Sequence, residues 1–133
     1  MPRGIRNHNP GNVRWDGRTQ WQGMTGADEL SFIVFGGPEW GIRAGIRDLL
    51  TGFRRDDEDT IREIITEWAP PSENDTASYI ASVSQRTGFG PDEELEPTAA
   101  NLERLFEAII WHENGQQPYQ YWVIAKGVQL ALA

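Results

Sequence analysis

The sequence predicts a mainly α domain (α+β) of about five helices, with a small irregular or β lobe at the N-terminus. Apolar residues recur at three- and four-residue intervals through most of the chain, in stretches that lie between helix-start and helix-stop signals. The first 26 residues contain many Gly, Asn and Arg residues and show little such periodicity. The length of 133 residues allows a real core, and residues 1–133 are expected to form a single domain.

The N-terminal lobe is expected to contain turns and short extended segments. Residues 9–12, Asn-Pro-Gly-Asn, predict a turn, because proline presets one backbone dihedral and glycine or asparagine accepts a positive φ. Residues 13–15 and 20–22 flank a favoured Asp-Gly turn and can pair as a small hairpin, although these flanks are polar. Residues 31–35, SFIVF, predict a short extended or buried segment.

The helices are expected after this lobe. Pro38 suits the first turn of a helix, while the Pro70-Pro71 pair, Gly88 and Gly115 mark helix ends. The expected helices cover about residues 38–54, 61–68, the stretch from a cap within 72–76 to Gly88, residues 98–114 and residues 121–132.

Composition excludes several classes of function. The net charge of −8 argues against a non-specific nucleic-acid binder, because such a chain cannot drive the release of counterions from phosphates. Without cysteine there are no disulfides, thiolate zinc sites or cysteine nucleophiles. The two histidines, His8 and His112, lie far apart and form no helical ligand pair, so we expect no metal site. A phosphate-binding glycine loop is also missing, and we expect no cofactor.

Two further patterns bear on location. No apolar run approaches the roughly 20 residues that span a bilayer, so membrane insertion is not expected. The N-terminus lacks the apolar core of a signal peptide, so any export needs another route.

In the stretch of residues 98–119, the apolar stripe of a predicted helix ends in a carboxylate. Five apolar residues form the stripe, and Glu113 is its next position: Leu102, Leu105, Phe106, Ile109 and Ile110. Partial desolvation and the negative end of the helix dipole both favour the protonated form of such an acid. We therefore expect Glu113 to be a proton-donating carboxyl. The alternative is that it turns outward into water at a frayed helix end.

One such acid beside a polar, aromatic-lined cleft is the minimum requirement for glycosidic cleavage. Amide and aromatic side chains suit sugars, since they offer paired donors and acceptors and flat ring faces. Candidate contacts to a saccharide are Asn9, Asn12, Tyr79 and Tyr119, and the alternative for each is ordinary use in the core or in turns.

Glu73 is the candidate for a second catalytic carboxylate. It lies in a polar segment directly after the Pro70-Pro71 bend, and loops commonly carry function. The alternative role is capping of the following helix. Glu39 is a third possibility, although its place in a helix first turn is already explained by the helix dipole.

Three segments carry a resemblance to a known group of proteins. RGIRNHNPGNVRW at residues 3–15 resembles the RGIRNNNPGNI signature of small phage and prophage proteins that are often labelled virion or muramidase-like. WAPPSENDTASYIASV at residues 68–83 and HENGQQPY at residues 112–119 resemble later blocks of the same group. The resemblance covers almost the whole chain and implies a bacteriophage protein.

A second resemblance concerns the lysozyme-like superfamily. AIIWHENGQQPY at residues 108–119 is similar to the helix end of lytic transglycosylases and phage lysozymes, where a Glu is the acid. Residues 9–15, 31–35 and 37–50 resemble the part that follows that Glu in peptidoglycan glucosaminidases. In those families the Glu helix comes first, whereas here it comes near the end. This order fits a circular permutation of the lysozyme-like fold, which is feasible because domain termini often lie close together.

These resemblances imply a peptidoglycan glycosidase, either a muramidase or a lytic transglycosylase, that cleaves the MurNAc–GlcNAc strand with Glu113 as the acid. Its partner would be bacterial peptidoglycan, reached from a phage virion or from the host cytoplasm by a route other than a signal peptide. The alternative is a non-catalytic virion or tail protein of lysozyme-like shape. An acid in a groove would favour the enzyme, and a salt-bridged surface acid would favour the scaffold. A peptidase is disfavoured, because no nucleophile or metal constellation is visible.

Overall fold

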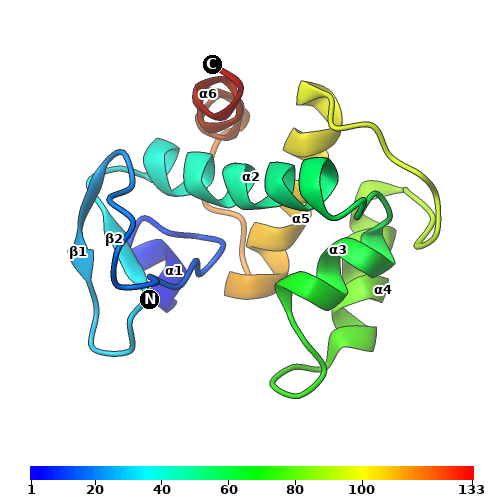
Figure 1. Cartoon of the computed structure of the whole chain (residues 1–133), viewed down its shortest axis with the longest axis horizontal. Coiled ribbons are helices and arrows are strands. Elements are labelled where there is room, and N and C mark those ends of the chain that lie inside the picture. The colour runs from blue at the N-terminus through cyan, green and yellow to red at the C-terminus, as the bar shows by residue number, and fades with distance from the viewer.

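Helix α5 (Ala99–Asn114) forms the centre of the fold in the computed structural model, which describes residues 1–133 (Figure 1). Its start and end follow from local chemistry. The Thr98 side chain accepts a hydrogen bond from the Asn101 backbone N–H, and Gly115 closes the helix in the left-handed conformation. The apolar stripe predicted for this helix is fully buried: Leu102, Leu105, Phe106, Ile109 and Ile110.

Four further long helices surround α5, and the predicted fold class is confirmed. They are α2 (Pro38–Arg55), α3 (Ile61–Trp68), α4 (Thr76–Thr87) and α6 (Tyr121–Leu132). The structure adds α1 (Arg3–Arg6), a single turn too short to produce a periodic pattern. None of the helices combines the length and apolar character needed to cross a bilayer.

The N-terminal lobe contains a two-stranded antiparallel sheet. β1 (Met24–Ala27) pairs with β2 (Ile33–Phe35), with Met24 opposite Phe35 and Ala27 opposite Ile33. The lobe has its own small apolar core, against which several tryptophans pack: Val13, Ile33, Phe35 and Ala44, with Trp15, Trp21, Trp40 and Trp68.

The predicted hairpin between residues 13–15 and 20–22 is wrong. Residues 13–15 lie instead along β2, where Ile33 donates to the Val13 carbonyl at 3.1 Å and Trp15 donates to the Ser31 carbonyl at 2.8 Å. The Asp-Gly turn itself forms, because Asp16 accepts hydrogen bonds from the backbone N–H groups of Arg18 and Thr19. The expected extended segment at residues 31–35 is confirmed in β2.

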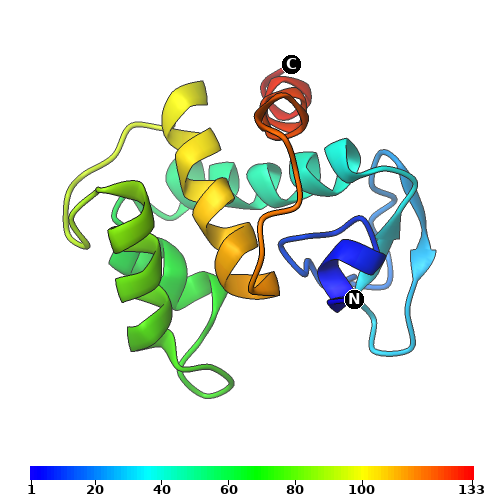
Figure 2. The ribbon, with the colours of Figure 1, turned by 180° about the vertical axis from the view of Figure 1, so that it is seen from behind.

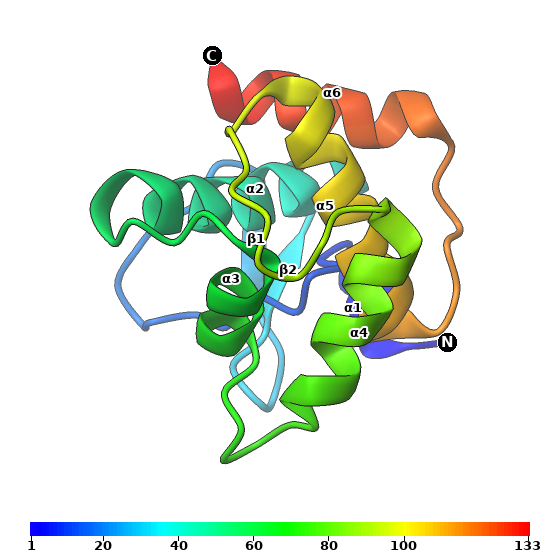
Figure 3. The same cartoon turned by 90° about the vertical axis from the view of Figure 1, so that its right-hand side faces the viewer.

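The elements form two lobes joined by α2. The N-terminal lobe lies beside one end of α2, and α3 and α4 lie towards the other (Figures 1 and 2). Helix α6 packs against α2 and lies above it in the side view (Figure 3). Glycines on α2 allow close approach: a Cβ on Gly41 would lie 1.8 Å from the His8 carbonyl oxygen, and one on Gly45 would lie 2.2 Å from the Phe106 ring. This face of α2 therefore receives both the N-terminal lobe and α5.

Candidate functional site

A groove of about 650 Å³ separates the N-terminal lobe from the helical lobe. One wall is formed by the loop at residues 11–14 with Phe32, and the other by the C-terminal half of α2, by α3 and by the turn that follows α3. The Glu113 side chain, from the last turn of α5, lines the groove as well. The predicted acid therefore lies where the two lobes meet.

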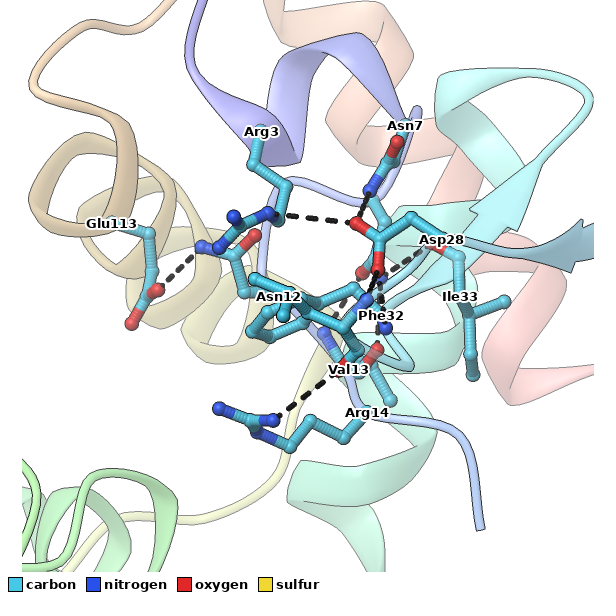
Figure 4. Close-up of polar contacts among 11 residues, drawn as sticks. Arg3, Asn7, Asn12, Val13, Arg14, Asp28, Phe32, Ile33 and Glu113 are labelled. Atoms are coloured by element: carbon cyan, nitrogen blue, oxygen red, sulfur yellow. Dashed lines mark hydrogen bonds and ion pairs between the residues drawn. The ribbon is translucent and has the colours of Figure 1, made fainter. Parts of the chain in front are cut away.

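Each oxygen of the Glu113 carboxylate accepts a hydrogen bond from a different lobe. The Asn12 Nδ2 group donates to Oε1 at 2.7 Å (Figure 4), and the Tyr79 hydroxyl donates to Oε2 at 2.8 Å. The carboxylate is half-buried and forms no ion pair with any cationic side chain. Asn12 and Tyr79 are thus brought together on the predicted acid. Tyr79 is buried and does not line the groove, so its predicted contact with a saccharide is wrong, whereas Asn12 does line the groove.

Tyr79 is suited to act as a permanent donor. Its side chain is buried in the main core, and its ring stacks on His112 with centroids 3.9 Å apart. Burial, together with the neighbouring Glu113 charge, raises the pKa of Tyr79 well above its ordinary value. The phenol therefore keeps its proton and points it at the carboxylate.

Asn12 reaches Glu113 from the predicted turn at residues 9–12. Its backbone is in the left-handed region, with φ of 53°, which asparagine tolerates better than most residues other than glycine. Asn9 holds this turn from inside, because its amide donates to the carbonyls of Val13 and Ile33, each at 2.9 Å, and accepts from the Val13 N–H at 3.0 Å. With 0% exposure, Asn9 cannot contact a ligand, and its predicted role in saccharide binding is wrong.

Tyr119 also lies outside the groove. It lies between α5 and α6 and packs, partly buried, against the main core. Its hydroxyl is buried without a hydrogen-bond partner, and burial raises the pKa of Tyr119 to about 12. The predicted contact with a saccharide is therefore corrected to a packing role.

Glu73 lines the groove from the turn between α3 and α4 and is exposed to solvent. It does not cap α4, because Asp75 is the capping residue and accepts a hydrogen bond from the Ser78 N–H at 3.1 Å. Glu73 thus remains available to a ligand in the groove. Glu39, the third carboxylate considered, does not line the groove.

Asp48 is a groove residue that sequence reasoning missed. It lies on the C-terminal half of α2 and has no hydrogen-bond or ion-pair partner in the structure. Asp48 is exposed to solvent in the groove, yet the neighbouring walls partly desolvate its carboxyl and raise the pKa of Asp48 to about 6. A signal was present in the sequence, since Asp48 continues at helical spacing the glycine face formed by Gly41, Gly45 and Gly52.

The groove is strongly acidic. Arg14 is the only cation among its lining residues. Six carboxylates line it: Asp48, Asp56, Glu58, Glu67, Glu73 and Glu113. Burial, followed by the charges of Glu67 and Asp56, raises the pKa of Glu58. Arg14 is held over the Phe32 ring, 4.4 Å from its centroid, rather than by a carboxylate. No group of three or more His, Asp or Glu side chains has an arrangement that could hold a metal ion.

Comparison with known proteins places the chain in a family. No family model matches it. It is 39% identical over 130 residues to protein P5 of Pseudoalteromonas phage PM2, covering 96% of this chain and 80% of that protein. The chain belongs to the family of protein P5. The similarity to P5 covers both lobes and α5. Because P5 is a bacteriophage protein, the predicted bacteriophage origin is supported.

Proposed function

We propose that this P5-family chain is a peptidoglycan-degrading glycosidase that cleaves the MurNAc–GlcNAc strand with Glu113 as general acid. One observation supports the proposal above the others. Of the six carboxylates that line the interlobe groove, Glu113 receives one hydrogen bond from each lobe and has no cation to neutralise it.

The chemistry begins with proton transfer from Glu113. Protonated Glu113 gives its proton to the glycosidic oxygen as the C–O bond breaks, and positive charge develops on the sugar. Each carboxylate oxygen can form a further hydrogen bond beyond the one it accepts from Asn12 or Tyr79. The carboxyl can therefore hold and release a proton while both side chains keep its orientation.

Two routes then complete the reaction. In a lytic transglycosylase, the deprotonated Glu113 takes the proton from the muramyl hydroxyl, and that oxygen closes a cyclic anhydro sugar. In a hydrolase, a second carboxylate orients water or stabilises the charged sugar. Asp48 and Glu73 are candidates for this role among the five other carboxylates that line the groove.

The groove also suits a glycan in size and lining. Its volume of about 650 Å³ lies within the range of ordinary ligand sites. Trp68 and Asn74 also line it, offering an aromatic ring and an amide. Sugars are commonly bound by this combination of flat apolar rings and paired polar groups.

The test compares Glu113→Gln with wild type on purified peptidoglycan, following turbidity and released muropeptides. Loss of a general acid is expected to lower the rate at least about 100-fold. Glu103→Gln is the matched control, because Glu103 lies on the same helix but outside the groove, where it accepts a surface hydrogen bond from Tyr121. Near wild-type clearing by Glu113→Gln would refute the assignment. Anhydromuramyl ends identify a transglycosylase and reducing ends a hydrolase.

A second candidate function is a non-catalytic phage protein that binds the cell wall or neighbouring subunits. The net charge of −8 favours contact with neighbouring subunits, because an acidic surface is poorly matched to the anionic polymer that a wall-degrading enzyme must approach. This candidate predicts that neither wild type nor Glu113→Gln releases muropeptides from peptidoglycan.

A further inference from the structure

Asn114, the residue after Glu113, joins the end of α5 to the start of the chain. Its side chain is buried, and its Nδ2 group donates to the Pro10 carbonyl at 2.9 Å and to the Ile110 carbonyl at 3.0 Å. The first bond spans 104 residues of sequence. A residue that serves only to end a helix does not need this contact, since Gly115 already closes α5.

Gly4 packs against the other side of the same amide. A Cβ on Gly4 would lie 2.7 Å from Asn114 Oδ1, 2.9 Å from the Asn9 carbonyl oxygen and 3.1 Å from Asn12 Oδ1. Only glycine therefore lets α1 approach both amides this closely. Neither Oδ1 atom has a hydrogen-bond partner, so both amides direct their NH₂ groups away from Gly4.

These contacts close a ring through the candidate acid. The backbone leads from Glu113 to Asn114, the Asn114 amide holds Pro10, the turn leads to Asn12, and the Asn12 amide returns to the Glu113 carboxylate. If the Asn12 amide were flipped, its oxygen would face the carboxylate and the hydrogen bond would be lost. The ring therefore fixes both the place and the direction of the Asn12 donor.

We propose that Asn114, supported by Gly4, is a positioning residue that acts on Glu113 through Asn12. The inference rests on the proposed glycosidase function and identifies how its acid is held. The 2.7 Å bond is short, so a shift of the turn by about 1 Å would break it. Without the Asn114 amide, the Pro10 carbonyl would also lose its buried donor, and this loss would favour a displacement of the turn.

A double-mutant cycle in activity separates positioning from mere support of the fold. Asn114→Ala in the wild-type background is expected to lower kcat about tenfold or more with KM nearly unchanged. In the Asn12→Ala background the same substitution should change kcat less than about twofold, because the bond it protects is already gone. Equal fold-losses in the two backgrounds would overturn the proposal.

A second readout does not depend on activity. In ¹⁵N spectra, the Asn12 side-chain NH₂ signals should lose protection from exchange in Asn114→Ala and in Gly4→Ala, which disturbs the same contact from the other side. Unchanged Asn12 signals in a folded variant would also overturn the proposal. If wild type releases no muropeptides, the glycosidase function fails, whereas this measurement still decides whether Asn114 positions Asn12.

Discussion

The six carboxylates of the groove differ in their surroundings, and these differences assign them different behaviour. Glu113 accepts two side-chain hydrogen bonds, so its carboxylate is held in one orientation. Asp48 accepts none and faces groove walls that disfavour its charge. Position comes from hydrogen bonds, whereas the ease of protonation at Asp48 comes from desolvation.

Asp48→Asn is expected to change the dependence of stability on pH. Partial desolvation by the groove walls raises the pKa of the exposed Asp48 from an ordinary 3.8 to about 6 in the folded chain, so the folded state binds the proton more tightly than the unfolded state. The resulting loss of folding stability is absent below the pKa of the unfolded state. It grows as pH rises between the two pKa values and is complete above the pKa of the folded state. The variant should therefore lose less stability than wild type between about pH 4 and pH 7.

Urea unfolding at closely spaced pH values, followed by tryptophan fluorescence, measures this difference. Asp92→Asn is a control in which the pH dependence of stability should change in the opposite direction, because the hydrogen bond from Arg62 lowers the pKa of Asp92. The contribution of Asp92 is present at neutral pH and is lost as pH falls. Parallel curves for wild type and Asp48→Asn across the interval would contradict the expected desolvation.

At the level of elements, the glycine face of α2 organises the fold. Interior glycines cost a helix about 0.5–1 kcal/mol each relative to alanine, so their presence needs a compensating gain. Gly41 and Gly45 supply it by letting the His8 carbonyl and the Phe106 ring touch the helix backbone. The same face presents Asp48 to the groove.

Gly45→Ala is expected to destabilise the chain, despite the better helix propensity of alanine. The new Cβ would lie 2.2 Å from the Phe106 ring, inside the main core, where overpacking costs about 1–3 kcal/mol. Gly52→Ala on the same helix is the matched control, because the only close group is the movable end of the Glu58 side chain. In urea unfolding, Gly45→Ala should be less stable than wild type, and Gly52→Ala should be at least as stable as wild type. The reverse order would show that α2 and α5 are not held this closely.

The same scale explains why the helices were predictable and the hairpin was not. Caps such as Thr60, which accepts from the Glu63 N–H at 3.2 Å, and Asp75 act within one turn of chain. Residues 13–15 had a local partner available through the Asp16 turn, but pairing with β2 buries Val13 and Phe32 as well. Tertiary burial therefore overrode a local turn signal.

At the level of the whole molecule, two lobes meet on one carboxylate within a negatively charged body. The chain carries a net charge of −8, and its groove holds a single arginine among carboxylates. An anionic polymer such as peptidoglycan is repelled by this field at long range. Under the proposed function, binding of peptidoglycan must then depend on short-range contacts in the groove.

Raising the ionic strength is expected to increase the rate of peptidoglycan cleavage. Between about 10 mM and 150 mM salt, the screening length falls from about 30 Å to about 8 Å, which weakens the repulsion between protein and polymer. The gain should appear as a lower apparent KM, measured by muropeptide release at several salt concentrations. Peptidoglycan with chemically amidated carboxylates is the control and should show a smaller salt effect. A rate that falls with salt would indicate attraction instead and contradict this account.

The sequence by itself determined the five long helices, the extended segment at residues 31–35 and the place of Glu113 at the end of a buried stripe. These features depend on interactions within a few residues, which periodicity and capping signals record directly. Only the tertiary structure decided which side chains reach Glu113, because Asn12 and Tyr79 lie 101 and 34 residues away along the chain. The same long-range packing buried Asn9, withdrew Tyr119 and brought Asp48 into the groove, since all three outcomes depend on how the lobes dock on α2 and α5.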